Sequence, residues 1–508
     1  MLKLYNTLTR KVEELKPVKE GQIGIYSCGP TVYWNQHVGH MYAYTQWDVL
    51  VRFLRYQGFQ VKWVMNITDV GHMTSDEDAG EDKMEKGAQR EGISVWQIAE
   101  RYIKQFVESM ELLNLQKPDV LCRATEHIAD QIDLIKKIEA NGFTYKTQTG
   151  LVFDTSKFSG YAKFAKLNLD QQNAGSRVEV DPEKKNPWDF LLWVTNQPNH
   201  VMQWDSPWGK GFPGWHIECT AMSVKYLGNQ FDIHTGGKEH VPVHHTNEIA
   251  QAYGAFGRQT ANCWVHNDWL KGKGGEKMSK SRGNVINPDD LVARYGADTV
   301  RAYLIFFCRW EQGGPWSSTG IEGNSRWLRR IWYMLLEPAE TKADLAVLRA
   351  LRRKTHQTLK RVTYDFENFE FNTIVSSLME LLNEMGRAKS AGAFGTEEWN
   401  ETADIYLRML APVCPHIAEE LWERLGKPYS VHTQAWPQAD EEAAKEDMLT
   451  LIVQVNGKLR DRILVDPGIS DEDAKKLALA SEAAQQSLEG RPIRKVIVVP
   501  ERLVNIVV

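Results

Sequence analysis

The stretch QIGIYSCGPTVYWNQHVGHMYAYTQWDVLVRFLRY, residues 22–56, decides the fold. Its first part, Gln22–Cys28, is rich in β-branched and aromatic residues and predicts a strand that Gly29-Pro30 ends. From about residue 38 to residue 56 the large apolar residues recur at helical spacing. A second strand is expected at Phe59–Thr68. Strand, helix and strand in this order are typical of a parallel sheet with crossover helices.

The same alternation continues along the next 200 residues. Amphipathic helices are expected at 95–114 and 127–142, and the polar stretch from about 156 to 187 indicates an insertion. Strand and helix signals then return in the order helix 214–227, strand 230–234, helix 244–256 and strand 262–267. We therefore expect an α/β, Rossmann-like nucleotide-binding domain that a connecting insertion interrupts.

The C-terminal part has a different pattern. Residues 325 to about 425 have apolar residues three and four apart and few glycines, which predicts a helix bundle. After the acidic stretch QADEEAAKED (438–447), the segments Leu449–Val455 and Leu459–Val465 flank Asn456-Gly457, a strong hairpin signal. A helix at 470–488 and two terminal strands would complete a small α/β module.

These patterns predict six regions. They are the first half of the nucleotide-binding domain (1–118), the connecting insertion (119–200), the second half (201–268), a loop region (269–324), the helical bundle (325–440) and the small C-terminal domain (449–508).

Composition narrows the class of protein. The chain has 508 residues and a net charge of −5, and no apolar run reaches the ~18 residues of a membrane span. Its first residues have no apolar core behind the basic ones, so we expect no secretory signal. Its six cysteines show no paired spacing and are expected to be thiols or metal ligands. We expect a cytoplasmic, monomeric protein that does not bind membranes.

Two short motifs carry chemistry. HVGH (His37–His40) stands at the head of a predicted helix, where free N–H groups and the helix dipole attract phosphate. KMSKS (Lys277–Ser281) lies on a Gly- and Lys-rich loop, and its lysines suit a leaving pyrophosphate. Alone, each motif is explained as readily by structural histidines or by a solvated basic loop. Together, in this order on one fold, they are specific.

In these motifs the chain resembles the class I aminoacyl-tRNA synthetases, and most closely the cysteinyl-tRNA synthetase family. The resemblance covers residues 1 to about 320 and rests on YSCGPTVYWNQHVGH, NITDV, WDSPWG, GWHIEC, FDIHTGG and HHTNEIAQ. It implies ATP-dependent activation of cysteine, with magnesium accompanying ATP, and transfer of cysteine to tRNA(Cys). It also implies one zinc ion per chain, held by Cys28, Cys219, His244 and Glu248.

The residue chemistry agrees with a metal site. His244 and Glu248 are four apart on a predicted helix, so both side chains are expected on one face. Cys28 ends a strand at the carboxyl edge, where ligands collect in open α/β sheets. His234, His240 and His245 remain competing ligands. Zinc prefers a soft thiolate to an alcohol, so coordination would distinguish cysteine from the nearly isosteric serine without a proofreading domain.

The resemblance assigns the remaining site residues. Cys28, Gly29, Thr68 and Trp215 would bind the cysteine substrate, with Trp215 as an aromatic lid. The nucleotide would contact His37, His40, Gly236, Gly237, Glu239 and Lys280. The catalytic groups would be His37, His40, Lys277 and Lys280.

The C-terminal half resembles leucyl-tRNA synthetase, through APVCPHIAEELWERLG, IVQVNGKLRDRILV and GRPIRKVIVVPERLVNIVV. Two other functions are considered. A ligase of the mycothiol-pathway type, which joins cysteine to an amino sugar, would not need an RNA-binding half. A regulatory RNA-binding protein without catalysis would not need both signature motifs.

Overall fold

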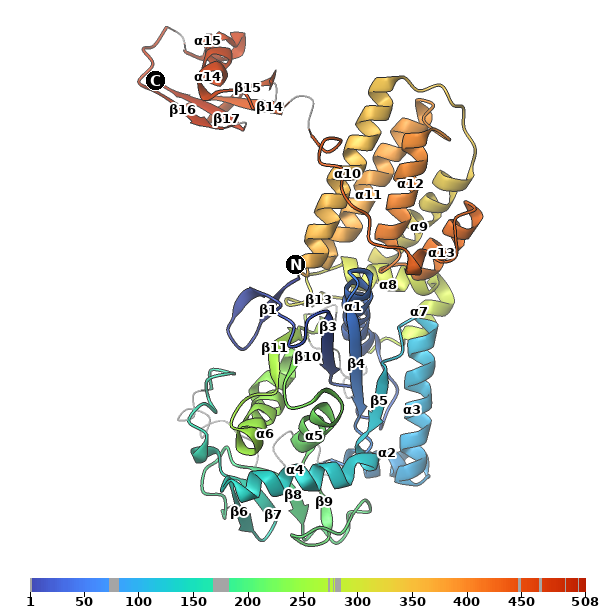
Figure 1. Cartoon of the computed structure of the whole chain (residues 1–508), viewed down its shortest axis with the longest axis vertical. Coiled ribbons are helices and arrows are strands. Elements are labelled where there is room, and N and C mark those ends of the chain that lie inside the picture. The colour runs from blue at the N-terminus through green and yellow to red at the C-terminus, as the bar shows by residue number, and fades with distance from the viewer. Residues whose placement is uncertain are drawn as a thin grey trace.

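The computed structural model describes residues 2–72, 82–167, 182–272, 275–276, 278, 285–445, 449–465, 468–488, 490–500 and 502–508. Figure 1 shows an elongated molecule in which the α/β region occupies the lower half, the helix bundle lies above it, and the small C-terminal module lies beyond the bundle. None of the described helices is long and apolar enough to cross a membrane.

The α/β region is built on a five-stranded sheet with the order β11-β10-β3-β4-β5, in which every neighbouring pair is parallel. Its strands are β3 (Gln22–Ser27), β4 (Gln60–Ile67), β5 (Val120–Arg123), β10 (Phe231–Gly237) and β11 (Ala261–Asn267). The helices around it are α1 (Val38–Tyr56), α2 (Lys83–Glu91), α3 (Val95–Leu112), α5 (Trp215–Leu227) and α6 (Thr246–Phe256). The predicted Rossmann-like fold is confirmed.

The strand order creates a crevice at the carboxyl edge of this sheet. The chain leaves β3 toward β4 on one side, whereas β10 lies on the other side of β3. The ends of β3 and β10 therefore form a topological switch point, the usual ligand site of open α/β sheets.

The connecting insertion differs from its sequence expectation in two ways. The short strand β5 falls within 119–200 but is an edge strand of the parallel sheet. An antiparallel sheet with α4 (Ile128–Ala140) beside it begins in the insertion and extends beyond residue 200. Its strands are β6 (Thr144–Thr147), β7 (Gly150–Phe153), β8 (Phe190–Thr195) and β9 (Gly211–Pro213), of which β9 falls in the expected second half. The sequence pattern did not predict this sheet, because β7 and β8 are buried along their whole length and show no alternation of polar and apolar residues.

A two-stranded N-terminal hairpin was also not predicted. It consists of β1 (Lys3–Asn6) and β2 (Lys11–Glu14), and the loop after β1 joins the parallel sheet through the N–H of Thr7, which donates to the carbonyl of Trp264 at 2.8 Å.

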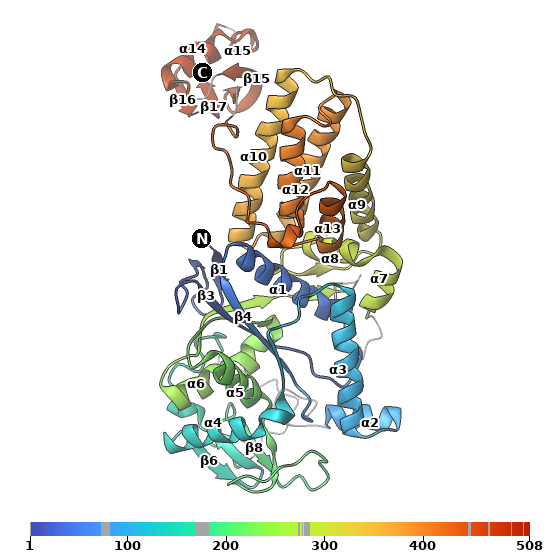
Figure 2. The same ribbon diagram turned by 45° about the vertical axis from the view of Figure 1, so that its right-hand side comes forward.

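Helices fill the region between the catalytic sheet and the C-terminal module (Figure 2). They are α7 (Pro288–Tyr295), α8 (Ala297–Phe306), α9 (Gly320–Leu336), α10 (Leu345–Glu367), α11 (Phe371–Ser390), α12 (Glu397–Leu410) and α13 (Pro415–Arg424). Two short strands, β12 (Leu270–Lys271) and β13 (Gly314–Pro315), precede the bundle. One apolar cluster runs from α1 into the bundle, where the Phe53 and Phe366 rings stack at 4.6 Å.

The C-terminal module is a four-stranded sheet of order β15-β14-β17-β16 with two helices on it. Its elements are β14 (Leu449–Val455), β15 (Lys458–Val465), α14 (Asp471–Ala480), α15 (Glu482–Leu488), β16 (Lys495–Val499) and β17 (Leu503–Val507). The hairpin turns through Asn456 and Gly457 with positive φ angles of 50° and 77°. The single helix expected at 470–488 is two helices, because Ser481 has an extended backbone and its hydroxyl accepts from the N–H of Ala484.

Candidate functional site

A cavity of about 460 Å³ opens at the switch point of the parallel sheet. Its floor comes from residues at or just beyond the carboxyl ends of β3, β4, β10 and β11, and one wall from the start of α1. The site residues expected from the sequence that line it are Cys28, Gly29, His37, His40, Thr68, Trp215, Cys219, Gly237, Glu239 and His244. Gly236 and Glu248 lie behind this surface, and Lys277 and Lys280 are outside the described residues.

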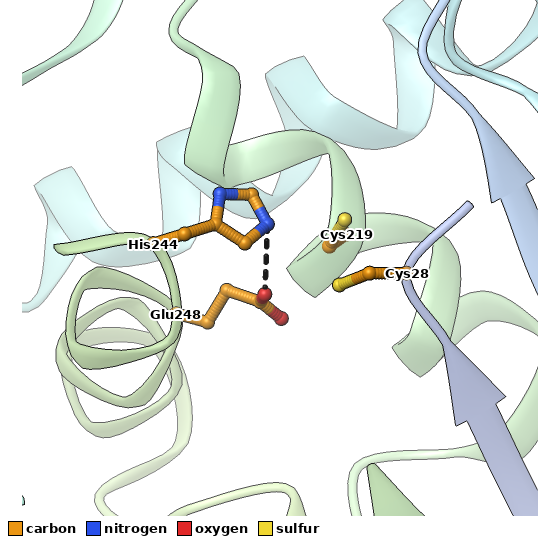
Figure 3. Close-up of side chains that lie close together, drawn as sticks. All are labelled: Cys28, Cys219, His244 and Glu248. Carbon is orange, nitrogen blue, oxygen red and sulfur yellow. Dashed lines mark ion pairs between the residues drawn. The ribbon is translucent and has the colours of Figure 1, made fainter. Parts of the chain in front are cut away.

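Four buried side chains converge at the inner end of the cavity (Figure 3). Donor atoms of Cys28, Cys219, His244 and Glu248 all lie within 4.8 Å of one another. They come from the end of β3, from α5, from the turn before α6 and from α6 itself. Chain segments almost 190 residues apart in sequence therefore supply the two sulfur atoms.

The local backbone at His244 differs from the expected regular helix. Val241–His245 forms a π-helical turn that leads into α6. Even so, the Nε2 atom of His244 lies 3.1 Å from a carboxylate oxygen of Glu248, so the two side chains do share one face. Such π-helical turns are frequent at functional sites.

A second set of donors overlaps the first. Cys28, His234, His245 and Glu248 also place their donor atoms within 4.8 Å of one another. His234 Nε2 lies 2.9 Å from Glu248, and His245 Nε2 lies 3.2 Å from the sulfur of Cys28. Both sets are buried, and they share Cys28 and Glu248. His240, the third competing histidine, belongs to neither set among the described residues.

Outer hydrogen bonds orient the candidate ligands. His244 Nδ1 lies 3.0 Å from Nδ1 of His216, which leaves His244 Nε2 directed toward the cluster. His245 Nδ1 lies 2.6 Å from Nε2 of His266, and His266 Nδ1 lies 2.8 Å from the hydroxyl of Thr7. Partners of this kind fix the orientation of histidines at metal sites.

The charge distribution suits a cation. Burial opposes ionisation of Cys28, but a hydrogen bond with Cys219 and the charge of His245 hold the pKa of Cys28 well below its usual value. Burial likewise opposes ionisation of Glu248, yet His234 and His244 lower its pKa to about 2. The pKa of His244 rises to about 10 despite burial, because Cys28 and Glu248 stabilise its proton. A metal ion would replace that proton.

The donor set fits zinc. Two thiols, one imidazole and one carboxylate form a mixed sulfur, nitrogen and oxygen set of the kind that binds Zn²⁺ with four ligands. The set with two sulfur atoms is softer than the set with two histidines and one sulfur atom. Soft donors favour zinc over magnesium or calcium.

Beside this cluster lies a small pocket. A Cβ atom on Gly29 would lie 1.7 Å from the carbonyl oxygen of Asn66, so only glycine allows this approach of β3 to β4. The hydroxyl of Thr68 donates to Glu218 at 2.9 Å, and the ring of Trp215 lies 4.5 Å from that of His244. Gly29, Thr68 and Trp215 thus surround a space that reaches the candidate metal ligands.

Three residues near this pocket were not singled out in the sequence. Glu218 is fully buried and bonds to both Thr68 and His72. Lys83 also lines the cavity. Glu218 lies within the quoted motif GWHIEC, and His72 lies two residues after the end of NITDV, and that proximity was the available signal.

The opposite end of the cavity is formed by the start of α1. The rings of His37 and His40 stack with centroids 3.7 Å apart, and Gly39 leaves room for the His37 ring. Across the cavity the indole N–H of Trp269 donates to Glu239 at 2.6 Å. Gly236 has no side chain where the ring of His245 approaches, since a Cβ atom there would lie 2.4 Å from it.

Comparison with known proteins agrees with this geometry. Residues 14–321 match the family described as tRNA synthetases class I (C) catalytic domain. Residues 349–476 match the anticodon-binding domain of tRNA ligase.

Relatives and a solved structure extend the comparison. A cysteine–tRNA ligase of Treponema denticola is 53% identical over 57% of this chain, and that match spans only 59% of the relative's length. A cysteine–tRNA ligase of Thermococcus gammatolerans is 33% identical over 97% of this chain and 99% of its own. The ternary complex of Agrobacterium radiobacter K84 LeuRS with tRNA and LeuAMS has a similar fold, with a TM-score of 0.76, 15% identity and 97% of each chain covered.

The Thermococcus relative includes the C-terminal half, so a leucine-type origin is not needed to explain that half. From the match over residues 14–321 and the near full-length relative, the chain belongs to the class I tRNA synthetases of the cysteine type.

Proposed function

We propose that this chain is a cysteine–tRNA ligase. In the first step the carboxylate of cysteine attacks the α-phosphorus of ATP, forming cysteinyl-AMP and releasing pyrophosphate. In the second step a ribose hydroxyl at the 3′ end of tRNA(Cys) takes the cysteinyl group and AMP leaves. The observation that supports the proposal is a single cavity with candidate metal ligands, two of them thiols, at one end. The start of α1, with His37 and His40, lies at the other end.

Selection of cysteine over serine would depend on the candidate metal ligands. Cys28, Cys219, His244 and Glu248 would hold one zinc ion, which when bound supplies a coordination position for the substrate thiolate that serine fills poorly. Gly29 and Thr68 would line the substrate's backbone side, and Trp215 would cover it. These residues exclude larger side chains and water.

Activation would take place at the α1 end of the cavity. The positive end of the α1 dipole favours phosphate there, and His37 and His40 lie beside it. Lys277 and Lys280 of KMSKS would stabilise the leaving pyrophosphate together with magnesium. Gly236 and Gly237 would allow close approach of the nucleotide, and Glu239 would accept from its ribose.

The tRNA would bind along the helical half. The match of residues 349–476 to an anticodon-binding domain supports this assignment. The bundle's basic residues are largely neutralised within the protein, for example Arg352 by Glu401 and Asp440, and Lys360 by Glu441. The C-terminal module keeps an exposed basic group, Lys458, Arg460, Arg462, Arg494 and Lys495.

Amino-acid-dependent exchange of pyrophosphate into ATP tests the proposal. Cysteine should support the exchange, whereas serine and the other eighteen amino acids should not. The cysteinyl-AMP that forms should then transfer its cysteine to tRNA. Exchange with cysteine but no charging of any tRNA would favour the small-molecule ligase. Absence of exchange with all twenty would refute the ligase function.

Substitution of the metal ligands tests the selection mechanism. Cys219→Ser and His244→Ala should lower zinc affinity by at least about 100-fold and reduce cysteine activation, while ATP affinity stays near the wild-type value. Metal analysis, exchange kinetics and nucleotide titration measure the three quantities. Cys263→Ala, at a buried thiol outside the cluster, is the matched control. A zinc-free protein that activates cysteine fully would contradict this mechanism.

A further inference from the structure

Lys83 is a basic residue inside the cavity to which no role has been assigned. It is the first residue of α2, and its Nζ atom lies 5.3 Å from the centre of the Trp215 ring. Lys83 lines the same cavity as Thr68, Cys219 and His244. The ammonium group is therefore at the amino-acid end of the site, on the side that Trp215 covers.

The position of Lys83 is fixed by its neighbour Asp82, which caps α2. One oxygen of Asp82 accepts from the N–H groups of Met84 and Glu85, at 2.6 and 2.9 Å. The other lies 2.6 Å from Nε2 of His200, and both side chains are about 3% exposed. His200 belongs to the connecting insertion, and its ring stacks on Phe212 at 3.8 Å.

Three further contacts hold the start of α2 beside Asp82 and His200, a pair that we call the Asp82–His200 clamp. Gly71 passes so close that a Cβ atom there would lie 1.9 Å from Asp82, and the N–H of Lys83 donates to the carbonyl of His72 at 3.0 Å. Glu85 accepts from the N–H of Val201 in the insertion at 2.8 Å. Since Asp82 is engaged by two N–H groups and by His200, we assign it a positioning role.

Helix stability does not explain a lysine at this position. The N-terminus of a helix carries partial positive charge, so a cation in the first turn is unfavourable by a few tenths of a kcal/mol or more. The cation–π contact with Trp215 offsets part of this cost. Because the side chain of Lys83 lines the cavity beside the Trp215 ring, its ammonium group lies where it can meet an anion that enters the cavity.

We infer that Lys83 binds the α-carboxylate of the cysteine substrate, and that the Asp82–His200 clamp positions it. The inference rests on the proposed function, because it assumes that the thiol of the substrate cysteine lies at the candidate metal ligands. With the thiol there and Trp215 covering the backbone, the carboxylate would come within reach of a lysine that approaches over the Trp215 ring. The lysine would hold the nucleophile in place for attack on ATP.

Binding of two thiols that differ in one group tests this inference. Cysteine and cysteamine share the thiol and the amine, but cysteamine has no carboxylate. By calorimetry with the zinc-loaded full chain, Lys83→Met should weaken cysteine binding about 10- to 100-fold and change cysteamine binding by less than about 2-fold. Lys83→Arg should restore most of the cysteine affinity. Lys104→Met, at an exposed lysine on α3, should change neither.

The possible outcomes distinguish the inference about Lys83 from the proposed function of the chain. Equal losses for both thiols would show that Lys83 only supports the pocket, and this would overturn the inference. Unchanged cysteine affinity with a raised KM for ATP would assign Lys83 to phosphate and would also overturn it. A wild-type protein that binds neither thiol would refute the proposed function as well. Melting temperatures near the wild-type value show that each variant is folded.

The positioning role of His200 has its own readout. His200→Leu removes the partner of Asp82 and should raise the KM for cysteine about 5-fold, with the KM for ATP unchanged. His200→Gln keeps a donor for Asp82 and should restore the KM. A raised KM for cysteine in His200→Leu that His200→Gln does not reverse would contradict the positioning role of His200. An equal rise in the KM for ATP would contradict it as well.

Discussion

Asp69 follows Thr68 of the pocket and illustrates how burial at this site alters a single residue. Burial raises the pKa of Asp69 to about 6, although the N–H and hydroxyl of Thr125 both donate to its carboxyl group. The ordinary value is near 3.9, so the folded state binds the proton more tightly than the unfolded state. Ionised Asp69 therefore reduces the stability of the fold.

This shift predicts a pH dependence with a definite sign. As pH rises from about 4 through about 6, Asp69 should cost the wild type up to about 3 kcal/mol of unfolding free energy. Asp69→Asn lacks the titration, so its stability relative to the wild type should increase over this range and stay level above it. Denaturant unfolding at pH 4, 5, 6 and 7.5 measures the difference. A difference that is independent of pH would contradict the shift.

Some site residues could be predicted from the sequence and others could not. Cys28 and the histidines of HVGH stand beside strand and helix boundaries, and such positions are visible in a local pattern. Cys219 required the family resemblance, because nothing local relates it to Cys28. Lys83 was not singled out because its proposed role depends on Trp215 and, through Asp82, on His200 of the insertion, and both are distant in sequence.

At the scale of elements, local pattern was sufficient where one face of an element is buried. The helix expected at 38–56 is α1 with the same bounds, and the hairpin expected around Asn456-Gly457 is β14 and β15. Pattern was insufficient for β7 and β8, which are buried on both faces. It also did not foresee the π-helical turn, because such turns depend on tertiary packing.

Arg301 shows how elements of both halves are joined. This fully buried side chain of α8 donates to the carboxylate of Asp48 in α1 at 2.7 Å. It also donates to four carbonyl oxygens, those of Leu113, Asn114, Pro412 and Val413. One residue thus ties the helix that begins at HVGH to the loop between α12 and α13 of the bundle.

Removal of this junction should be costly. Arg301→Met would remove one donor from the buried carboxylate of Asp48, which keeps Arg52 and the N–H of Gln116, and one donor from each of the four carbonyl groups. This loss should lower the unfolding free energy by about 3–5 kcal/mol. Lys360→Met removes the exposed pair with Glu441 and should cost less than about 1 kcal/mol. Denaturant unfolding of both variants makes the comparison. Equal, small losses would show that the junction does not hold the two halves together.

At the scale of the whole molecule, the catalytic sheet and the C-terminal module lie at opposite ends with the bundle between them (Figures 1 and 2). The bundle shares its apolar core with α1, whereas the described residues of the C-terminal module form a core of their own. A substrate that contacts both ends must therefore be long. A folded RNA meets this requirement, and an amino sugar does not.

Truncation before Leu449 should separate RNA binding from catalysis. The module has its own core, so the remaining protein should keep its fold, its melting temperature and its cysteine-dependent pyrophosphate exchange. The exposed basic group Lys458, Arg460, Arg462, Arg494 and Lys495 would be lost, and each phosphate contact contributes about 0.7 to 0.9 to the salt slope. Affinity for tRNA should fall, and the slope should become less steep by about 2 to 4. If the module only stabilises the bundle, the melting temperature should fall instead, with tRNA affinity and salt slope unchanged. Filter binding across a salt series and thermal melting of the same preparation decide between these two roles.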